Sequence, residues 1–151
     1  MRIVVQRVKR ASVTIDTQIV GSIRQGLLLL VGVENTDSDE DIEWLCQKII
    51  KMRIFDDSEG VMNLPIESLS DGGILVVSQF TLLASTKKGN RPSYIRAARP
   101  EVAVPIYEKF VQRIRQLYGP NVQTGRFGAD MQVELVNDGP VTIIIDSKER
   151  Q

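Results

Sequence analysis

The strongest constraint on the fold is an unbroken apolar run, LLLLVGV, which begins directly after Gly26. The run is short for a helix, and the absence of polar residues at alternate positions is typical of a strand covered on both faces. We therefore expect a central strand here. A second strand with both faces apolar is expected at Ile74–Leu83.

Strand and helix patterns alternate along the rest of the chain. Six further stretches predict strands, at residues 1–8, 11–16, 19–23, 121–127, 131–136 and 141–146. Apolar residues at helical spacing predict a helix that begins after Ser38, where Asp41 would complete a capping box. A second helix is expected to end at Tyr118, before a Gly-Pro pair, and residues 56–73 are expected to form an irregular connection. The order β-β-β-β-α-β-α-β-β-β describes an α/β fold with a mixed sheet system backed by two helices.

The chain has the length of one domain and lacks residues that several classes of enzyme need. With 151 residues it can bury roughly 70% of its unfolded surface around one core, so we expect a single domain, 1–151. It contains no His, which excludes Ser-His-Asp and Cys-His catalytic groups and His-ligated zinc. No spacing typical of metal ligands is visible, and we expect neither a metal nor a cofactor.

The single cysteine and the short apolar runs bear on the cellular compartment. One Cys cannot form an intramolecular disulfide, which is typical of proteins in a reducing cytosol. Cys46 lies on the apolar stripe of the first expected helix, so we interpret it as a core thiol, with a nucleophile as the alternative. No apolar run approaches the roughly 20 residues that cross a bilayer. We therefore expect a cytoplasmic protein without a membrane-embedded segment.

Three polar residues interrupt the second apolar run. Ser78, Gln79 and Thr81 surround Phe80 in a stretch that otherwise has the pattern of a buried strand. A buried amide or hydroxyl costs roughly 1–3 kcal/mol if it has no hydrogen-bond partner. These side chains are therefore either paired with one another or arranged to hold a ligand. Because no His can activate Thr81, holding a ligand suits its hydroxyl better than nucleophilic attack.

A basic segment without acidic residues follows at Ser85–Arg99. Its cationic residues are Lys87, Lys88, Arg91, Arg96 and Arg99. In a chain with no net charge, such a local patch favours a phosphate-bearing partner such as nucleic acid. The alternative is a solvated loop without a special role.

The third unusual segment is NDGPVT, residues 137–142. An Asp-Gly pair between two alternating stretches is typical of a β-hairpin turn. Pro140 complicates this interpretation, because a Gly-Pro bond can adopt the cis form and redirect the adjacent carbonyl groups. A plain hairpin turn and a special backbone feature both remain open at this stage.

Six stretches that together cover most of the chain carry a resemblance to a known family. They are QRVKRASV, GLLLLVGV, KMRIFDDSEGVMN, VVSQFTLLA, KKGNRPSY and TGRFGADMQVELVNDGPVT. With these stretches the chain resembles the D-aminoacyl-tRNA deacylases, and the combination of SQFTL and NDGPVT in this order is highly specific. The resemblance implies a deacylase-type fold, in which largely antiparallel sheets form a barrel-like core backed by two helices.

The resemblance also implies a function and a set of site residues. The expected enzyme is a homodimer that hydrolyses the ester between a D-amino acid and the 3′ end of tRNA, a proofreading step in translation quality control that also accepts glycyl-tRNA. The implied catalytic pocket, which receives the terminal adenosine and the aminoacyl group, is lined by Ser78, Gln79, Phe80 and Thr81. The implied substrate-binding residues are Gly139, Pro140, Arg7, Phe127 and Met131. The Gly-Pro pair, joined by a cis bond, would enter the pocket of the other subunit, and Arg7 would brace it. We expect the tRNA to contact the basic segment through Lys87, Lys88 and Arg91.

Elementary chemistry is consistent with this assignment. An aminoacyl ester is already activated and carries a neighbouring 2′-hydroxyl, so the protein has mainly to position it and to stabilise the developing oxyanion. Backbone N–H groups near Phe80 and Thr81 are candidate donors, and the 2′-hydroxyl of the substrate could orient the attacking water. Covalent attack by Thr81 is the alternative route.

Selection of the D form is expected to work by exclusion. If the carbonyl groups of Gly139 and Pro140 crowd the position of an L side chain, then D-aminoacyl esters and glycyl esters fit and L esters do not. The alternatives from other functional classes are a non-catalytic RNA-binding module and a structural dimerisation domain.

Overall fold

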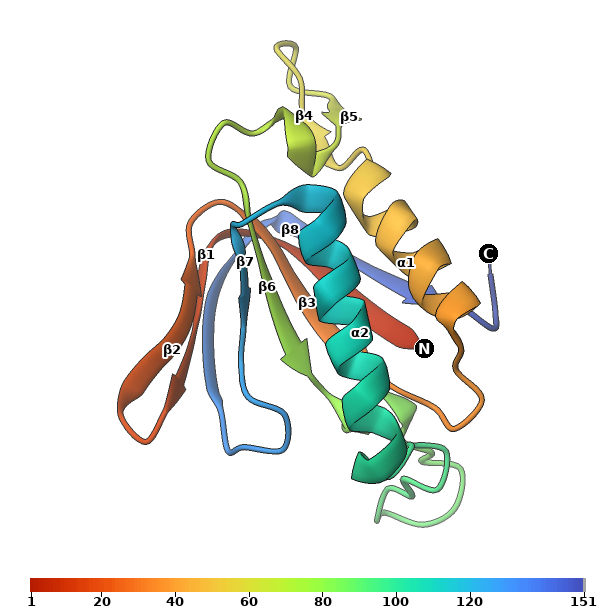
Figure 1. Cartoon of the computed structure of the whole chain (residues 1–151). Coiled ribbons are helices and arrows are strands. Elements are labelled where there is room, and N and C mark those ends of the chain that lie inside the picture. Colours follow the sequence, from red (N-terminus) through yellow and green to blue (C-terminus); the bar gives the residue numbers. More distant parts are fainter. Residues whose placement is uncertain (151) are drawn as a thin grey trace.

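A six-stranded sheet, bent into a nearly closed barrel, forms the centre of the computed structural model, which describes residues 1–150 (Figure 1). The elements in chain order are β1 (Arg2–Ile15), β2 (Gln18–Ile23), β3 (Gly26–Gly32), α1 (Asp39–Lys51), β4 (Phe55–Asp56), β5 (Met62–Leu64), η1 (Ile66–Ser68), β6 (Gly73–Ser78), η2 (Phe80–Leu83), α2 (Pro100–Tyr118), β7 (Val122–Thr124) and β8 (Gln132–Asp146). The strands are ordered β2-β1-β3-β6-β7, and β8 pairs with β1. The β3–β6 and β6–β7 pairs are parallel and the others antiparallel, so the expected mixed barrel-like fold with two helices is confirmed.

The central strands β3 and β6 separate two apolar cores, which explains their continuous apolar sequences. Leu27 and Leu29 of β3 pack in the core beneath the helices, whereas Leu28, between them, packs inside the barrel. In β6, Val76 and Leu75 divide between the two cores in the same way. Because successive side chains of a strand point to opposite faces, only strands that are apolar throughout can serve both cores.

The two helices lie side by side over one face of the sheet (Figure 1). At the start of α1 the backbone N–H of Ser38 donates to the carboxylate of Asp41 at 2.8 Å, so the predicted capping box is confirmed. The helices are also joined by an ion pair between Arg113 and Glu43 at 2.6 Å. Gly119, with φ 113°, ends α2 at the predicted position.

Several predicted boundaries are wrong in detail. The stretches 1–8 and 11–16 are one strand, β1, so three strands precede α1 instead of four. The connection 56–73 contains the small β4–β5 hairpin and a 3₁₀ turn, and β7 is only three residues long. Positions 9 and 10 are exposed, yet the strand continues through them because β8 pairs with β1 at Val8 and again at Arg10.

The predicted strand Ile74–Leu83 is too long, since β6 ends at Ser78 and a 3₁₀ turn, η2, follows. The last pair in the β3–β6 ladder joins Val31 to Ser78, and β3 itself ends one residue later. Beyond that point β6 has no partner strand. The chain turns, and Leu83 becomes part of the buried interior.

The hairpin interpretation of residues 137–140 is also wrong. Residues 131–136 and 141–146 do not fold back on each other, because both belong to β8, which pairs with β1 from Thr14↔Gln132 to Arg2↔Asp146. The fourteen-residue β1 offers β8 a whole free edge, and this long pairing replaces the tight turn that Asp-Gly favours locally. The extra residues form a bulge in β8.

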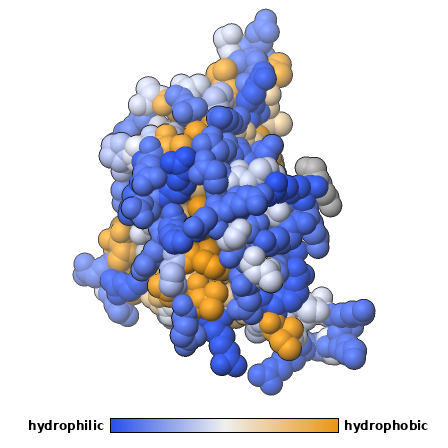
Figure 2. Space-filling model, turned by 45° about the vertical axis from the view of Figure 1, so that its right-hand side comes forward, coloured by the Kyte–Doolittle hydropathy of each residue, from blue (hydrophilic) through white to orange (hydrophobic). Residues whose placement is uncertain are grey.

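The molecular surface is mostly hydrophilic on the face drawn in Figure 2, where apolar side chains gather in a few separate patches. The large apolar residues that are exposed are Ile19, Val20, Val61, Met62, Phe80, Tyr94, Ile95, Val102 and Ile144. Within residues 1–150, no helix has the length and apolar character required to cross a membrane.

Candidate active site

A cavity of about 170 Å³ lies where β6 ends and η2 begins. Five predicted site residues line it, namely Ser78, Gln79, Phe80, Phe127 and Met131. The remaining lining residues are small or apolar: Val31, Val33, Val77, Ala98, Ala103, Gly128 and Val133. The fold thus brings Ser78, Gln79 and Phe80 together with residues some fifty positions later in the chain, whereas Thr81, the fourth predicted catalytic residue, does not line the cavity.

The polar groups of the SQFT segment are arranged by the end of the β3–β6 ladder. The N–H of Gln79 still donates to Val31 O, at 2.7 Å. In contrast, the N–H groups of Phe80 and Thr81 donate no hydrogen bond to any group of residues 1–150. Two backbone donors at the start of η2 are therefore available to a ligand.

The side chains of Gln79 and Thr81 contact each other. The Gln79 amide Nε2 donates to the Thr81 hydroxyl oxygen. No carboxylate, lysine or other base accepts a hydrogen bond from this hydroxyl within residues 1–150. The geometry provides Thr81 with an orienting donor and not with a general base, so it offers no route to an activated threonine nucleophile.

Residues 125–131 close the opposite side of the cavity and are tied to β6. Val76 O accepts two hydrogen bonds, from the Gly125 N–H at 3.0 Å and from the Tyr107 hydroxyl at 3.1 Å. The Tyr107 ring packs edge-on against Phe127, with 5.6 Å between centroids. Burial raises the pKa of Tyr107 to about 12, so this phenol stays neutral and serves as a support for Phe127.

Arg7 is a buried cation placed opposite the bulge in β8. Its side chain is folded against the backbone, with Nη1 donating to Ile54 O at 2.7 Å and Nε donating to Asp138 O at 3.1 Å. The carboxylates of Asp56 and Asp138 lie at 3.2 and 3.5 Å from the guanidinium. Arg7 therefore holds the residue that precedes Gly139, and a Cβ on Gly139 would lie 3.0 Å from Arg7 Nη2.

Gly139 and Pro140 project from β8 and do not line the cavity of their own chain. Both residues are exposed, Gly139 has φ +122°, and the peptide bond between them is cis. Val133 of β8 lines the cavity, and Asn137 lies four residues later in the same strand. At 3.3 Å per residue these two residues are roughly 13 Å apart, and the Gly-Pro pair lies farther still from the cavity. In Figure 1 the arrow of β6 points downward, whereas β8 bends at the top of the sheet.

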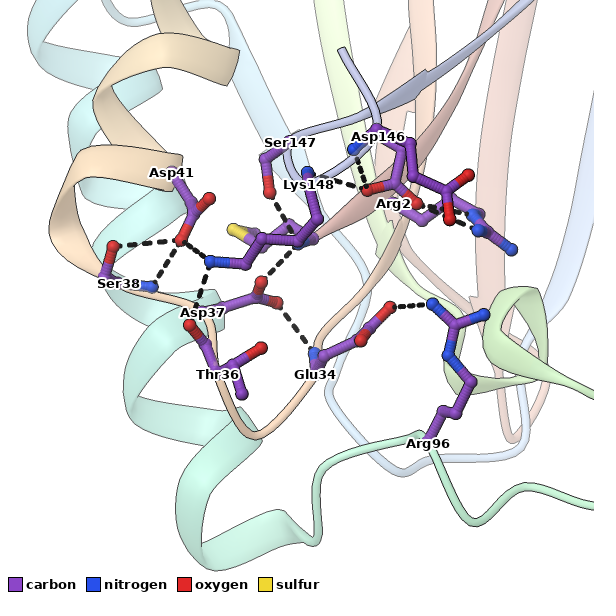
Figure 3. Close-up of polar contacts among 12 residues, drawn as sticks. Arg2, Glu34, Thr36, Asp37, Ser38, Asp41, Arg96, Asp146, Ser147 and Lys148 are labelled. Carbon is purple, nitrogen blue, oxygen red and sulfur yellow. Dashed lines mark hydrogen bonds and ion pairs between the residues drawn. The ribbon is translucent and has the colours of Figure 1, made fainter.

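The basic segment Ser85–Arg99 contains one anchored cation and several unpaired ones. The guanidinium of Arg96 donates to the carboxylate of Glu34 at 2.8 Å, as Figure 3 shows. Lys87, Lys88 and Arg91 are exposed and form no ion pair with any residue of 1–150. The predicted RNA-binding residues therefore lie outside the cavity, on a loop that begins one residue after η2.

Cys46 and the acidic residues provide no second catalytic centre. Burial raises the pKa of the Cys46 thiol to about 12, and the residue is fully buried, which confirms its interpretation as a core thiol. No group of three or more His, Cys, Asp or Glu side chains suited to a metal ion occurs in the described part of the chain.

A larger hollow of about 580 Å³ lies elsewhere, between α1 and the second half of β8. Its lining includes Trp44, Leu82 and Ile144, together with the ion pair of Arg2 and Asp146 at 2.9 Å. No predicted site residue lines it. Its apolar walls and one satisfied ion pair suit a contact surface better than a reaction.

Sequence reasoning missed the partners of Arg7 and the apolar walls of the cavity. Ile54 and Asp56 lie in the stretch KMRIFDDSEGVMN, but nothing in their local pattern indicates that they meet Arg7. Asp138 could have been noticed as the acid next to the Gly-Pro pair. Ala98 reaches the cavity because its N–H donates to Val33 O at 2.9 Å, a contact between segments sixty-five residues apart.

Comparison with known proteins gives consistent matches over the whole chain. The family model described as D-Tyr-tRNA(Tyr) deacylase matches residues 4–146. A D-aminoacyl-tRNA deacylase of Bacteroides thetaiotaomicron is 62% identical over 152 residues, and one of Flavobacterium psychrophilum is 60% identical over 151 residues; each match covers 100% of both chains.

Two solved structures are similar in fold. The c-Myc DNA unwinding element binding protein has a TM-score of 0.91 and 38% identity, over 97% of this chain and 98% of that one. A probable eukaryotic D-amino acid tRNA deacylase has a TM-score of 0.81 over 95% of this chain and 97% of its own. At 17% identity the second likeness concerns the fold alone.

Proposed function

Because the chain belongs to the D-Tyr-tRNA(Tyr) deacylase family, we propose that it hydrolyses the ester of D-aminoacyl-tRNA to free D-amino acid and tRNA. The observation that carries this proposal is a pair of free backbone N–H groups, one on Phe80, which lines the cavity, and one on the next residue, Thr81; neither donates a hydrogen bond within residues 1–150. Fixed backbone donors of this kind stabilise the oxyanion that forms when water attacks an ester. With charged tRNA as substrate, we place the reaction in the cytosol.

Water is the proposed nucleophile. The Thr81 hydroxyl has a donor, Gln79, and no base beside it, so it is better placed to hold the substrate than to attack it. The 2′-hydroxyl of the terminal ribose would orient the water. Phe127 and Met131, which form the apolar wall opposite Gln79, would contact the terminal adenosine.

Selection against L-aminoacyl esters is proposed to come from Gly139 and Pro140 of a second copy of the chain. Within one chain this pair is separated from the cavity by a length of strand that a side chain cannot span. The hollow near Leu82 of η2 and Ile144 of β8 offers an apolar surface on which a twofold-related copy could bring its β8 close to η2. Carbonyl groups supplied in this way would exclude an L side chain and would admit D-amino acids and glycine.

The unpaired cations Lys87, Lys88 and Arg91 are proposed to contact the phosphates of the tRNA acceptor end. Replacing Lys87 and Lys88 with Ala should weaken tRNA binding and reduce its salt dependence. Hydrolysis of a short D-aminoacyl-adenosine should be unaffected. An unchanged salt dependence would remove the loop from the tRNA contact surface.

The activity is tested by incubating the purified protein with D-Tyr-tRNA, L-Tyr-tRNA and glycyl-tRNA. Release of D-Tyr and glycine with little release of L-Tyr is expected. Equal release of D-Tyr and L-Tyr would contradict selection by exclusion. Binding of tRNA without any release would instead indicate a non-catalytic RNA-binding module, and no affinity for tRNA would indicate a dimerisation domain.

The contribution of two chains to one site is tested by mixing two variants. Gln79→Ala in the pocket should lose activity, whereas Pro140→Ala in the projecting segment should hydrolyse D-Tyr-tRNA but lose selection against L-Tyr-tRNA. If the site combines two chains, the one intact pocket of a co-expressed mixed dimer meets the intact Gly-Pro segment, and selection against L-Tyr-tRNA returns. If each chain completes its own site, the intact pocket keeps its Pro140→Ala segment, and the mixed dimer stays unselective.

A further inference from the structure

Two exposed aromatic residues lie beside the mouth of the cavity. Phe80, which lines the cavity, is 53% exposed, and Tyr94, on the basic segment, is 41% exposed. Their rings pack edge to face, with centroids 5.1 Å apart and planes at 74°. Within residues 1–150 no other aromatic side chain is this exposed, so the pair stands apart from the aromatic residues of the core.

The pair has no evident role in the stability of the chain itself. The Tyr94 hydroxyl forms no hydrogen bond with any group of residues 1–150, and both rings leave much of their apolar area in water. Aromatic rings contribute most when they are buried, and a partly exposed ring pair at the rim of a cavity is more useful to a ligand than to the fold.

The position of Tyr94 is fixed by contacts on both sides. Before it, Ser85 and Ser93 exchange two backbone hydrogen bonds at 2.8 and 2.9 Å. After it, the N–H of Ala97 donates to Tyr94 O at 3.0 Å, and Arg96 is bound to Glu34. Figure 3 shows this ion pair joining the basic segment to the loop after β3. These contacts hold the backbone on both sides of Tyr94, and the ring itself packs against Phe80. A pair held in this way loses less entropy when a ligand binds.

Charge around the pair favours a polyanion. The segment that carries Tyr94 has five cations and no acid, and Lys87, Lys88 and Arg91 are unpaired. A groove that combines cations with accessible aromatic faces is the chemistry by which proteins bind single-stranded nucleic acid, whose bases stack on the rings while its phosphates meet the cations.

The size of the cavity limits how much of the substrate it can contain. Its volume of about 170 Å³ is small beside the roughly 300–1,000 Å³ of pockets that enclose a drug-sized ligand. The aminoacyl group and the nucleoside that carries it suffice to fill it. A preceding nucleotide has to lie outside, and the adjoining surface there is the Phe80–Tyr94 pair.

We propose that the Phe80–Tyr94 pair is a stacking platform for the unpaired base that precedes the ester-bearing terminal nucleotide of the tRNA. The inference rests on the proposed function and extends it, because it makes the enzyme a reader of a single-stranded 3′ tail and not only of its last nucleoside. Tyr94 is then a substrate-binding residue outside the reacting centre.

The test compares three substrates: D-Tyr-tRNA, the same tRNA with an abasic penultimate nucleotide, and D-tyrosyl-adenosine. Tyr94→Ala should lower kcat/KM on intact D-Tyr-tRNA by about 5- to 140-fold, the effect of losing one base stack. It should leave hydrolysis of D-tyrosyl-adenosine unchanged. The kcat/KM of the wild-type protein on abasic tRNA should fall to that of Tyr94→Ala on intact tRNA. Tyr94→Ala should lose no further activity when its substrate is the abasic tRNA.

Two control variants separate the ring from its surroundings. Tyr94→Phe keeps the ring and should retain wild-type kcat/KM on all three substrates. Ile95→Ala removes apolar area from a neighbouring residue that is 85% exposed, without removing a ring, and should also have little effect.

Three results would overturn the platform. The first is an equal loss for Tyr94→Ala on tRNA and on D-tyrosyl-adenosine, which would place the residue in the chemistry. The second is full wild-type activity on abasic tRNA. The third is a shift of Tyr94→Ala toward monomer or dimer in sedimentation, together with equal kcat/KM of the wild-type protein on abasic and intact tRNA. This result would make the pair a contact between two copies of the chain. If the wild-type protein hydrolyses none of the three substrates, the proposed function itself has failed.

Discussion

Replacing Arg7 with Met should both destabilise the protein and weaken its selection of D-aminoacyl over L-aminoacyl esters. Arg7 is only 6% exposed, and its guanidinium donates to two backbone carbonyls, those of Ile54 and Asp138. Met fills most of the same volume without supplying a donor. The substitution therefore removes the hydrogen bonds with little loss of packing.

The magnitude follows from the contacts. Each hydrogen bond from a charged donor contributes about 1.5–3 kcal/mol, so the two carbonyl contacts together account for about 3–6 kcal/mol. The ion pair with Asp56 adds little, because that carboxylate is half exposed and screened by water. A loss of this size is a large part of the roughly 5–15 kcal/mol by which domains are stable.

Urea unfolding measures this loss. With a slope of about 2 kcal/mol per M, the midpoint should fall by about 1.5–3 M. Lys9→Met is the matched control, since Lys9 lies on the same strand and is within 3.5 Å of the same Asp138 but is 62% exposed. Its midpoint should change by less than about 0.5 M, as expected for a surface pair.

A second variant keeps the activity readout interpretable if Arg7→Met is largely unfolded. Arg7→Lys retains the charge but not the planar fork, so it should remain folded while the ratio of kcat/KM for D-Tyr-tRNA to kcat/KM for L-Tyr-tRNA falls at least tenfold. If Arg7→Met costs less than about 1 kcal/mol, or if Arg7→Lys keeps wild-type chiral selection, Arg7 does not brace the Gly-Pro segment as argued.

Three further predictions concern the core and the pH dependence of stability. Because burial raises the pKa of Cys46 to about 12, the thiol should resist alkylation at pH 8 in the native protein and react at once in urea; rapid native labelling would contradict its burial. Although burial raises the pKa of Asp41, hydrogen bonds to its carboxylate hold that pKa well below its ordinary value, so it contributes stability above about pH 4 that is lost as the pH falls. Asp41→Asn should therefore cost about 1–3 kcal/mol at pH 7 and flatten the fall in stability between about pH 4 and 2, whereas a parallel pH curve would exclude this role. Gly26→Ala would place a Cβ 1.9 Å from Gly73 O in the paired strand, so its melting temperature should drop far more than that of Gly60→Ala, which meets no atom within 4 Å.

The pattern of apolar residues was sufficient to predict the central strands and the helix ends. A strand that is apolar at every position, such as residues 27–31, has to be covered on both faces, and the structure places cores on both sides of it. The capping residues at Ser38 and the stop at Gly119 also act through neighbours within four residues, which a sequence displays directly.

The motifs also identified five of the twelve residues that line the cavity, although not its geometry. Ser78, Gln79, Phe80 and Thr81 were predicted as a group; the structure places the first three with Phe127 and Met131 around one cavity and leaves Thr81 outside its lining. The N–H groups of Phe80 and Thr81 lack acceptors because the ladder between β3 and β6 ends just before them. The end of β3 is a property of the partner strand and not of the motif.

The tertiary structure alone decided the conformation of the NDGPVT segment. Asp-Gly favours a hairpin locally, but β8 pairs along the free edge of β1 on both sides of the bulge. Arg7 lies opposite the bulge and donates a hydrogen bond to Asp138 O. Likewise, only the fold brings Tyr94 onto Phe80. Periodicity and capping are encoded by neighbours in sequence, whereas strand pairing and ring contacts join residues that no local pattern relates, and so they were settled only when the chain had folded.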